Sequence, residues 1–322
     1  MTEHVLLYLQ LLKLTAIEDF VLKLVHDTIK STSKSLTILV DCPETTQTAV
    51  WEEVQELLSI LYVKAAKTTQ EFRKPLLEVD VLFKDWCGYN VLLERNKSYD
   101  CWVASRKHEQ ILAYYNSQRE EAGLDLVTIY SIPEEEAGID IELTANSKKR
   151  YRPEEKHYPN VAVGGTFDHL HVGHKILLTM GAWLSEKRLI CGVAGTEMLG
   201  KKEYANLVQS LDIRIEHVRK FLNRVKRGLV YEIVPIHDTY GPTSKDPDIQ
   251  AIVVSKETLT GAYEINRERS KRDFEELEIK IIQVISKSSR ALAKNELRNL
   301  QISSAQIREY LHSHPEKYPC TE

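Results

Sequence analysis

The feature that most constrains the fold is a regular alternation of short apolar runs with helical patterns from residue 160 onward. Between two of these runs, Leu211, Ile215 and Val218 begin an apolar stripe at helical spacing, which can cover one face of a sheet. Runs that are apolar throughout are typical of strands buried on both faces. The runs are residues 161–163, 189–193, 230–236, 249–254 and 279–285. The pattern predicts an α/β fold with a doubly wound parallel sheet.

The first half of the chain shows a similar alternation of apolar runs and helical patterns. This alternation predicts another α/β module, N-terminal to the one just described. Its apolar and helical segments are residues 36–40, 50–66, 77–83, 101–104, 108–121 and 124–132. Charged residues then replace the pattern, which indicates a linker. A length of 322 residues also exceeds one typical domain. We therefore expect an N-terminal α/β module at 1–132, a charged linker at 133–157 and a second domain at 158–322, with no internal repeat.

The composition narrows the classes of partner and compartment. The net charge of -4 and the pI near 6.3 provide no overall attraction to nucleic acid or anionic lipid. No window reaches the ~18 uninterrupted apolar residues of a membrane span, and the N-terminus lacks a signal-peptide pattern. Five scattered cysteines without C-x-x-C spacing suit a reducing compartment. We expect a cytoplasmic protein that binds neither nucleic acid nor membrane, and a basic cluster at 148–152 leaves nuclear import open.

A glycine-rich turn directly follows the apolar run 161–163. The turn consists of Gly164, Gly165, Thr166, Phe167 and Asp168. Glycines permit a close approach of the backbone to a ligand. Ligands of open parallel sheets bind beyond the carboxyl ends of the strands. The turn is therefore the predicted edge of a binding site.

A helix is predicted to begin soon after this turn, at His171-Val172-Gly173-His174. The unpaired N–H groups and the dipole at the start of a helix favour an anion. His171 and His174 are three residues apart, so both can face the same side of the first turn. Two imidazoles could then contact neighbouring phosphates. A metal pair or ordinary capping histidines would also explain an isolated H-x-x-H pattern.

The sequence G-T-F-D followed by H-x-G-H resembles the signature of the nucleotidylyltransferase superfamily. Within that superfamily, residues 160–310 are similar to the pantetheine-phosphate adenylyltransferases of eukaryotes, of the fungal kind. Segments 238–247 and 253–269 extend this similarity over about half of the chain. The chain has His169 where the nicotinamide mononucleotide enzymes and the bacterial pantetheine-phosphate enzymes of the superfamily carry proline. The expected acceptor is therefore assigned from the resemblance of the later segments. Residues 1–150 resemble no catalytic family.

This resemblance implies transfer of AMP from ATP to 4'-phosphopantetheine, which gives dephospho-coenzyme A and pyrophosphate in coenzyme A biosynthesis. The nucleophile is already an anion, so the protein has to align two anions and stabilise charge at phosphorus. His174 is expected at the α-phosphate and His171 at an adjacent phosphate, and Lys201 or Lys202 at the acceptor phosphate. The remaining expected substrate contacts near the turn are Gly164, Gly165, Thr166, Phe167, Asp168 and Gly173.

Two later segments resemble phosphate-binding elements of the family. Arg269, with Arg267 as a second candidate, resembles an arginine that contacts ATP phosphates, although both could lie on a plain exposed helix face. Ser303, Ser304 and Arg308 resemble an element that meets the triphosphate, although they could equally form a helix cap and first turn. Magnesium is expected to arrive with ATP, because the sequence shows no dedicated carboxylate cage and no other metal site.

Two other functions remain open. A cytidylyltransferase for a phosphorylated alcohol would share G-T-F-D and H-x-G-H, but it would carry R-T-E-G-I-S-T where residues 299–304 read Asn-Leu-Gln-Ile-Ser-Ser. A non-catalytic scaffold for coenzyme A enzymes would not need the histidines. Residues 1–150 are expected to serve interaction or stability, including docking of other coenzyme A enzymes.

Overall fold

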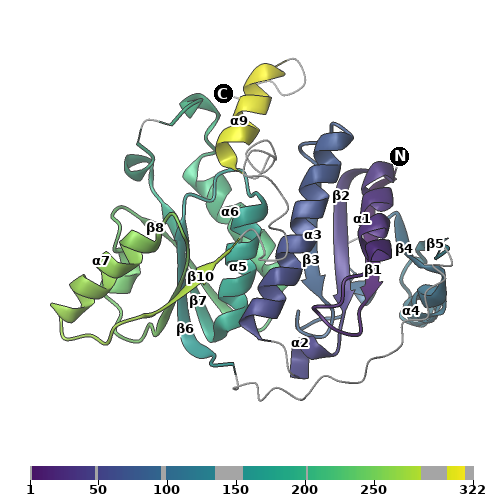
Figure 1. Ribbon diagram of the computed structural model, residues 1–322, viewed down its shortest axis with the longest axis horizontal. Coiled ribbons are helices and arrows are strands. Elements are labelled where there is room, and N and C mark those ends of the chain that lie inside the picture. Colours follow the sequence, from purple (N-terminus) through teal and green to yellow (C-terminus); the bar gives the residue numbers. More distant parts are fainter. Residues whose placement is uncertain are drawn as a thin grey trace.

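The chain folds into two α/β domains that lie side by side, each built on a parallel sheet (Figure 1). The computed structural model describes residues 2–47, 50–95, 99–134, 155–200, 202–283 and 303–315. Helices α3 and α5 pack against each other between the two sheets, while α4 and α7 lie at opposite ends of the molecule (Figure 1). The predicted fold class, a doubly wound parallel sheet preceded by a second α/β domain, is confirmed.

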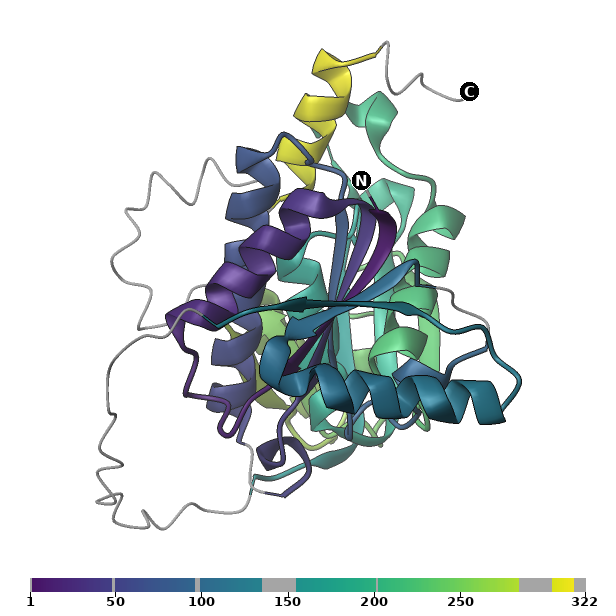
Figure 2. The ribbon, with the colours of Figure 1, turned by 90° about the vertical axis from the view of Figure 1, so that its right-hand side faces the viewer.

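The first domain contains five parallel strands in the order β3-β2-β1-β4-β5. Its strands are β1 (Thr2–Gln10), β2 (Thr32–Asp41), β3 (Glu78–Phe83), β4 (Cys101–Ser105) and β5 (Thr128–Ile132). Its α-helices are α1 (Asp19–Ser31), α2 (Glu44–Gln47), α3 (Trp51–Glu71) and α4 (Glu109–Glu121), and it has 3-10 turns at Val91–Leu93 and Arg106–His108. Figure 2 shows α4 lying alongside β5, the strand at one edge of this sheet.

The second domain contains five parallel strands in the order β10-β9-β6-β7-β8. Its strands are β6 (Tyr158–Gly165), β7 (Ser185–Ala194), β8 (Val230–Ile236), β9 (Ala251–Ser255) and β10 (Glu278–Ile282). Its α-helices are α5 (Val172–Leu184), α6 (Leu211–Val225), α7 (Leu259–Ser270) and α9 (Ser304–Ser313), and 3-10 turns occur at Thr196–Met198, Ala205–Leu207 and Gly241–Ser244. Each strand coincides with one of the five apolar runs on which the prediction was based.

The two domains have the same topology. In each, the first strand is central and pairs with the second strand on one side and the fourth on the other. The first strand also carries a register shift near its start in both domains, at Thr2/His4 and at Tyr158/Asn160. Such a bulge is a specific feature rather than a chance irregularity. The two domains are therefore structural copies of one unit.

The helix and loop that lead into the last strand of each sheet, α4 before β5 and α7 before β10, make the same hydrogen bonds in both domains. In the first domain the Asn116 side chain donates to the Val127 carbonyl at 2.7 Å and accepts from its N–H at 3.0 Å. In the second, Asn266 makes the same pair of bonds with Leu277, at 3.0 and 2.9 Å. The expectation that the chain has no internal repeat is therefore wrong. In both domains the asparagine satisfies a backbone N–H and a carbonyl next to the last strand.

A shared apolar core joins the domains. Trp183 of α5 packs on Trp86 and Phe83 of the first domain, with ring centroids 5.0 and 6.0 Å apart. Buried residues of both domains form one contiguous hydrophobic cluster. The domains are thus packed as one body rather than joined only through residues 133–157, of which 135–154 lie outside the described residues.

A buried carboxylate also joins the domains. Asp80 of β3 is 5% exposed. Its carboxylate accepts a hydrogen bond from Lys175 Nζ at 2.8 Å and pairs with Arg224. Lys175 also donates to the Val79 carbonyl at 2.8 Å. Because Lys175 directly follows His174, the first domain holds the first turn of α5 in place.

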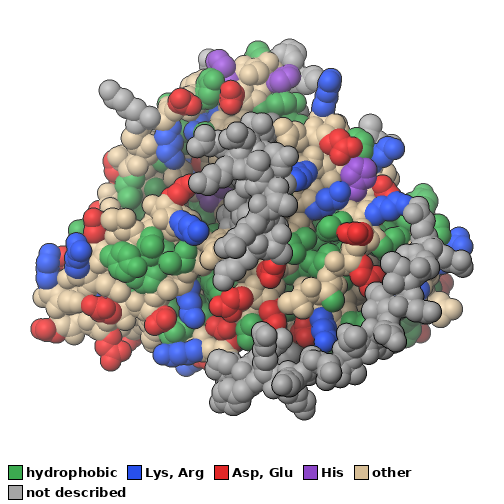
Figure 3. Space-filling view, in the orientation of Figure 1, with side chains coloured by type: hydrophobic (Ala, Val, Ile, Leu, Met, Phe, Trp, Pro, Cys, Tyr) green, Lys and Arg blue, Asp and Glu red, His purple; other side chains and the backbone are tan. Residues whose placement is uncertain are grey.

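The molecular surface agrees with the small net charge. Lys, Arg, Asp and Glu side chains are interspersed on the face seen in Figure 3, without a broad area of one sign. No helix among the described residues is both long and apolar enough to cross a bilayer.

Candidate active site

The glycine-rich turn leaves the carboxyl end of β6 in a strained path. Phe167 and His169 have φ angles of 52° and 43°, in the left-handed region that residues other than glycine rarely adopt. The Phe167 ring is fully buried and anchors the turn. A Cβ atom at position 165 would lie 3.2 Å from that ring, so Gly165 makes room for it. Such strain is typical of functional loops that the surrounding structure holds in shape.

His171 caps the helix that follows the turn. Its Nδ1 accepts a hydrogen bond from the Gly173 N–H at 3.1 Å at the start of α5. An imidazole that accepts at Nδ1 carries its proton on Nε2 when neutral. Burial, followed by the charge of Lys175, lowers the pKa of His171 to about 3. The residue therefore serves as a cap and keeps an N–H donor for a ligand.

His174 stacks on His171 within the same helical turn. The ring centroids are 3.8 Å apart and the planes are inclined by 29°. Burial, followed by His171 and Lys202, lowers the pKa of His174 well below its usual value. Its Nδ1 is buried without a hydrogen-bond partner among the described residues. A buried polar atom that lacks a partner in a cleft is a natural contact for a ligand.

The unfolding free energy should fall as the pH is lowered from 7 to 5. A histidine titrates near pH 6.5 in the unfolded chain, whereas the folded chain holds the pKa of His171 at about 3. Between these values the unfolded chain binds more protons, so each such histidine removes up to about 1.4 kcal/mol of stability per pH unit. Urea unfolding at several pH values measures this slope. His171→Gln should make it shallower, and an unchanged slope would contradict a buried neutral imidazole.

Lys202 lies next to the histidines. Its Nζ donates to Thr166 Oγ1 at 3.1 Å. Burial and the nearby charge of Arg308 lower the pKa of Lys202. Cationic and neutral N–H donors thus converge beside the start of α5, which favours an anionic ligand. Lys201, the alternative from the sequence, lies outside the described residues.

Asp168 has a structural role that the sequence did not suggest. It is fully buried. Its carboxylate accepts from the Gln209 N–H at 2.9 Å and pairs with Arg308. Its carbonyl accepts from Ser304 Oγ at 2.6 Å. Because these bonds occupy the carboxylate, Asp168 attaches α9 to the turn and does not present an oxygen to substrate.

The segment around α9 is attached to the glycine-rich turn through Asp168. Ser303 caps α9, with its Oγ accepting from the Gln306 N–H at 3.4 Å. Arg308 also donates from Nε to the Glu203 carbonyl at 3.1 Å. The helix cap is therefore present, and the contact with the triphosphate stays a prediction.

Arg269 does not take part in the site. It is fully buried, and its guanidinium donates to carbonyls of residues 243, 246, 247, 249 and 275, from 2.6 to 3.3 Å away. The equivalent Arg119 of the first domain also donates to two loop carbonyls. The expectation of a phosphate contact at Arg269 is therefore wrong, because every donor group is already used to hold a loop. Arg267 is exposed on the same helix.

One residue that shapes the site was missed in the sequence. Arg214 is 1% exposed and donates to the carbonyls of Thr166 and Ala194 at 2.8 and 2.7 Å. It thereby ties the glycine-rich turn to the end of β7. Its position between Leu211 and Val218, on the apolar stripe of α6, is the signal that could have identified it.

Comparisons with known proteins agree with this geometry. The cytidylyltransferase-like family matches residues 162–310. An uncharacterized protein of Schizosaccharomyces pombe is 32% identical over 283 residues, which cover 86% of each chain. The phosphopantetheine adenylyltransferase of Saccharomyces cerevisiae is 40% identical over 149 residues, 45% of this chain and 49% of the yeast protein. That of Methanopyrus kandleri is 39% identical over 142 residues, 44% of this chain and 89% of the archaeal one.

The parallel sheet, the glycine-rich turn and the stacked H-x-G-H histidines define a nucleotidyltransferase. Within that superfamily, this chain belongs to the phosphopantetheine adenylyltransferase-like proteins. The match spans about half the length of the yeast relative. The archaeal relative is matched over most of its length by less than half of this chain.

Proposed function

We propose that this chain transfers AMP from ATP to 4'-phosphopantetheine, a step of coenzyme A synthesis. The observation that carries the proposal is the stacked pair His171 and His174 at the start of α5, within reach of Lys202. Two relatives that are 40% and 39% identical over 149 and 142 residues carry the name of this activity. The two imidazoles are neutral, so they can donate hydrogen bonds to phosphate oxygens without titrating near neutral pH.

The protein's task in this reaction is alignment and charge stabilisation. The phosphate of the acceptor is already a nucleophile, so no general base is required. The His174 ring holds the α-phosphate, His171 an adjacent phosphate and Lys202 the acceptor phosphate. Gly164, Gly165 and Thr166 border the reacting groups.

Magnesium fits this site only when it arrives with the nucleotide. Among the described residues, imidazoles, Lys202 and the Thr166 hydroxyl lie at the site, and the carboxylate of Asp168 is already paired. Magnesium held by ATP would neutralise charge on the pyrophosphate. The protein would then hold the ion through the phosphates rather than through carboxylates of its own.

A matrix of nucleotides and acceptors tests the proposal. The purified full chain receives ATP or CTP, each with 4'-phosphopantetheine, phosphocholine, phosphoethanolamine or glycerol phosphate, and pyrophosphate release is measured. We expect turnover with ATP and 4'-phosphopantetheine. Turnover that depends on CTP would instead indicate a cytidylyltransferase, and no turnover with any pair would indicate a scaffold for other coenzyme A enzymes.

Lys202→Ala should raise the KM for the phosphorylated acceptor by about 10-fold to 100-fold, because a hydrogen bond to a charged group is worth about 1.5–3 kcal/mol. The adjacent Lys201→Ala is the matched control, and its KM should change little. Steady-state kinetics with the acceptor as the varied substrate measure both. The opposite ranking would assign the acceptor phosphate to Lys201.

A further inference from the structure

The repeat of the fold places a second potential ligand site in the first domain. In a doubly wound sheet, ligands bind where the strand order reverses, beyond the carboxyl ends of the strands. In the first domain this point lies between β1 and β4. A cavity of about 260 Å³ opens there. Its walls come from the end of β1, the start of α1, the end of β4 and the turn Arg106–His108.

Strand register defines which residues of the two domains correspond. Leu7 pairs with the fourth strand of its sheet as Val163 does in the second domain. Leu9 therefore occupies the position of Gly165. Glu18 occupies the N-cap position of α1 as His171 does that of α5, but its side chain does not make the capping hydrogen bond that His171 makes.

The phosphate-binding features are absent from this first-domain site. Val21 stands three residues after the cap, where the second domain has His174. Glu18 and Asp19 bring negative charge to the start of α1, where a phosphate would otherwise be favoured. Leu9, at the position that corresponds to Gly165, lines the cavity with an apolar side chain. A phosphate would therefore be repelled at this helix, whereas an uncharged group would not.

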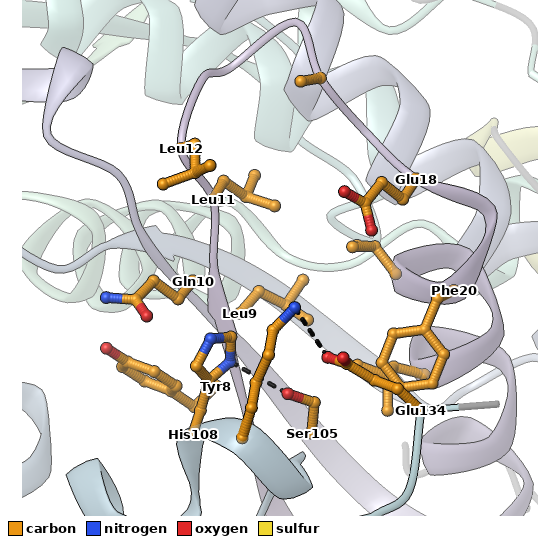
Figure 4. A pocket seen from close by; sticks show the side chains of 14 residues that line it. Tyr8, Leu9, Gln10, Leu11, Leu12, Glu18, Phe20, Ser105, His108 and Glu134 are labelled. Carbon is orange, nitrogen blue, oxygen red and sulfur yellow. Dashed lines mark hydrogen bonds and ion pairs between the residues drawn. The ribbon is translucent and has the colours of Figure 1, made fainter. Parts of the chain in front are cut away.

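The cavity combines apolar walls with a few polar and charged groups. Apolar side chains of Leu9, Leu11 and Phe20 line it (Figure 4). A few polar groups lie along one side, where Ser105 Oγ is 3.1 Å from His108 Nδ1 (Figure 4). Small-molecule sites typically combine apolar walls with a few placed polar groups in this way.

Two further residues mark the polar side and the mouth of the cavity. Lys107 pairs with Glu134 at 2.9 Å. Leu12, at the rim, is 88% exposed. An apolar side chain so exposed at a cavity mouth is available to cover a ligand.

We propose that this cavity, lined by Leu9, Leu11, Phe20, Ser105 and His108, binds an uncharged nucleoside. The first domain has the topology of the second and a cavity at its strand reversal, with Glu18 and Val21 at the positions that correspond to His171 and His174. The nucleoside is the part of a nucleotide that such a site still accommodates. This site is separate from the proposed reaction, and its occupancy is measured without turnover.

Methyl NMR of the full chain tests the proposal directly. Adenosine is titrated to millimolar concentrations while the methyl signals of Leu11, Leu12 and Leu24 are followed. Leu170 and Val172 report on the second domain in the same spectra. We expect saturable shifts at the three first-domain leucines. Shifts only at Leu170 and Val172, or no shifts, would overturn the proposal.

Two variants make the test specific. Ala16 lines the cavity from an exposed position, so Ala16→Trp should block the leucine shifts without loss of folding, whereas the exposed Ala113→Trp on α4 should not. AMP should bind about tenfold more weakly than adenosine, or about 1.4 kcal/mol, because of the acidic helix start. The exposed Glu18→Gln should narrow that difference. Equal binding of AMP and adenosine, or shifts that persist in Ala16→Trp, would contradict the assignment.

Discussion

Turnover of the His174→Ala variant is expected to fall by about 100-fold or more, with the fold retained. Removing one preorganised donor from a site that stabilises developing charge typically has this effect. His174 is held by its stacking on His171 and by the Phe167 ring 5.2 Å away, so a loose water cannot reproduce its position. Single-turnover and steady-state kinetics with ATP and 4'-phosphopantetheine measure the loss, and circular dichroism checks the fold.

The matched control for that variant is His26→Ala. His26 lies on α1 of the first domain and pairs with Asp27 at 3.0 Å, away from the H-x-G-H turn. Turnover of His26→Ala should stay within about twofold of that of the unchanged chain, because this partly buried side chain lies outside the site. Equal turnover in folded His174→Ala and His26→Ala would favour the scaffold over the enzyme.

Asp80→Ala should reduce the free energy of unfolding by about 3–5 kcal/mol. Removing one partner of a buried ion pair leaves an uncompensated charge in the interior. Here two cations, Lys175 and Arg224, would lose their carboxylate at the boundary between the domains. Urea unfolding followed by tryptophan fluorescence measures the change, because Trp86 and Trp183 lie in the same boundary.

The nearby Asp85→Ala is the control for this loss. Asp85 is 48% exposed and lies 3.7 Å from Lys84, so its removal should cost no more than about 1 kcal/mol. A loss below about 1 kcal/mol in Asp80→Ala as well would contradict a buried charge link. In the folded fraction, Asp80→Ala should also lower turnover, because Lys175 holds the turn that carries His174.

The fold could be predicted from the sequence because a strand that is buried on both faces of its sheet is apolar at nearly every position. Each run of apolar residues from 161 onward became a strand of the second sheet. The H-x-G-H pair could also be placed, since a glycine turn between a strand and a helix has few possible geometries. The stacking of His171 on His174 and the buried Nδ1 of His174 depend on three-dimensional packing and could not be predicted.

The arginines show where local patterns fail. An arginine that binds phosphate and one that holds loop carbonyls have the same side chain, and the spacing around Arg269 does not distinguish them. Arg119 repeats the role of Arg269 in the first domain, but so few other side chains match that the repeat is hidden in the sequence. Asp168 and Arg308 are 140 residues apart, so only the folded chain reveals that they neutralise each other.

The tryptophan contact between the domains has a consequence for any attempt to separate them. Trp183 belongs to the second domain, yet part of its burial comes from Trp86 and Phe83. Residues 155–322 produced alone would present this indole to water, and would tend to self-associate through it. A chain cut once between residues 134 and 155 would instead remain a tight non-covalent pair, since the two fragments would still share their apolar boundary.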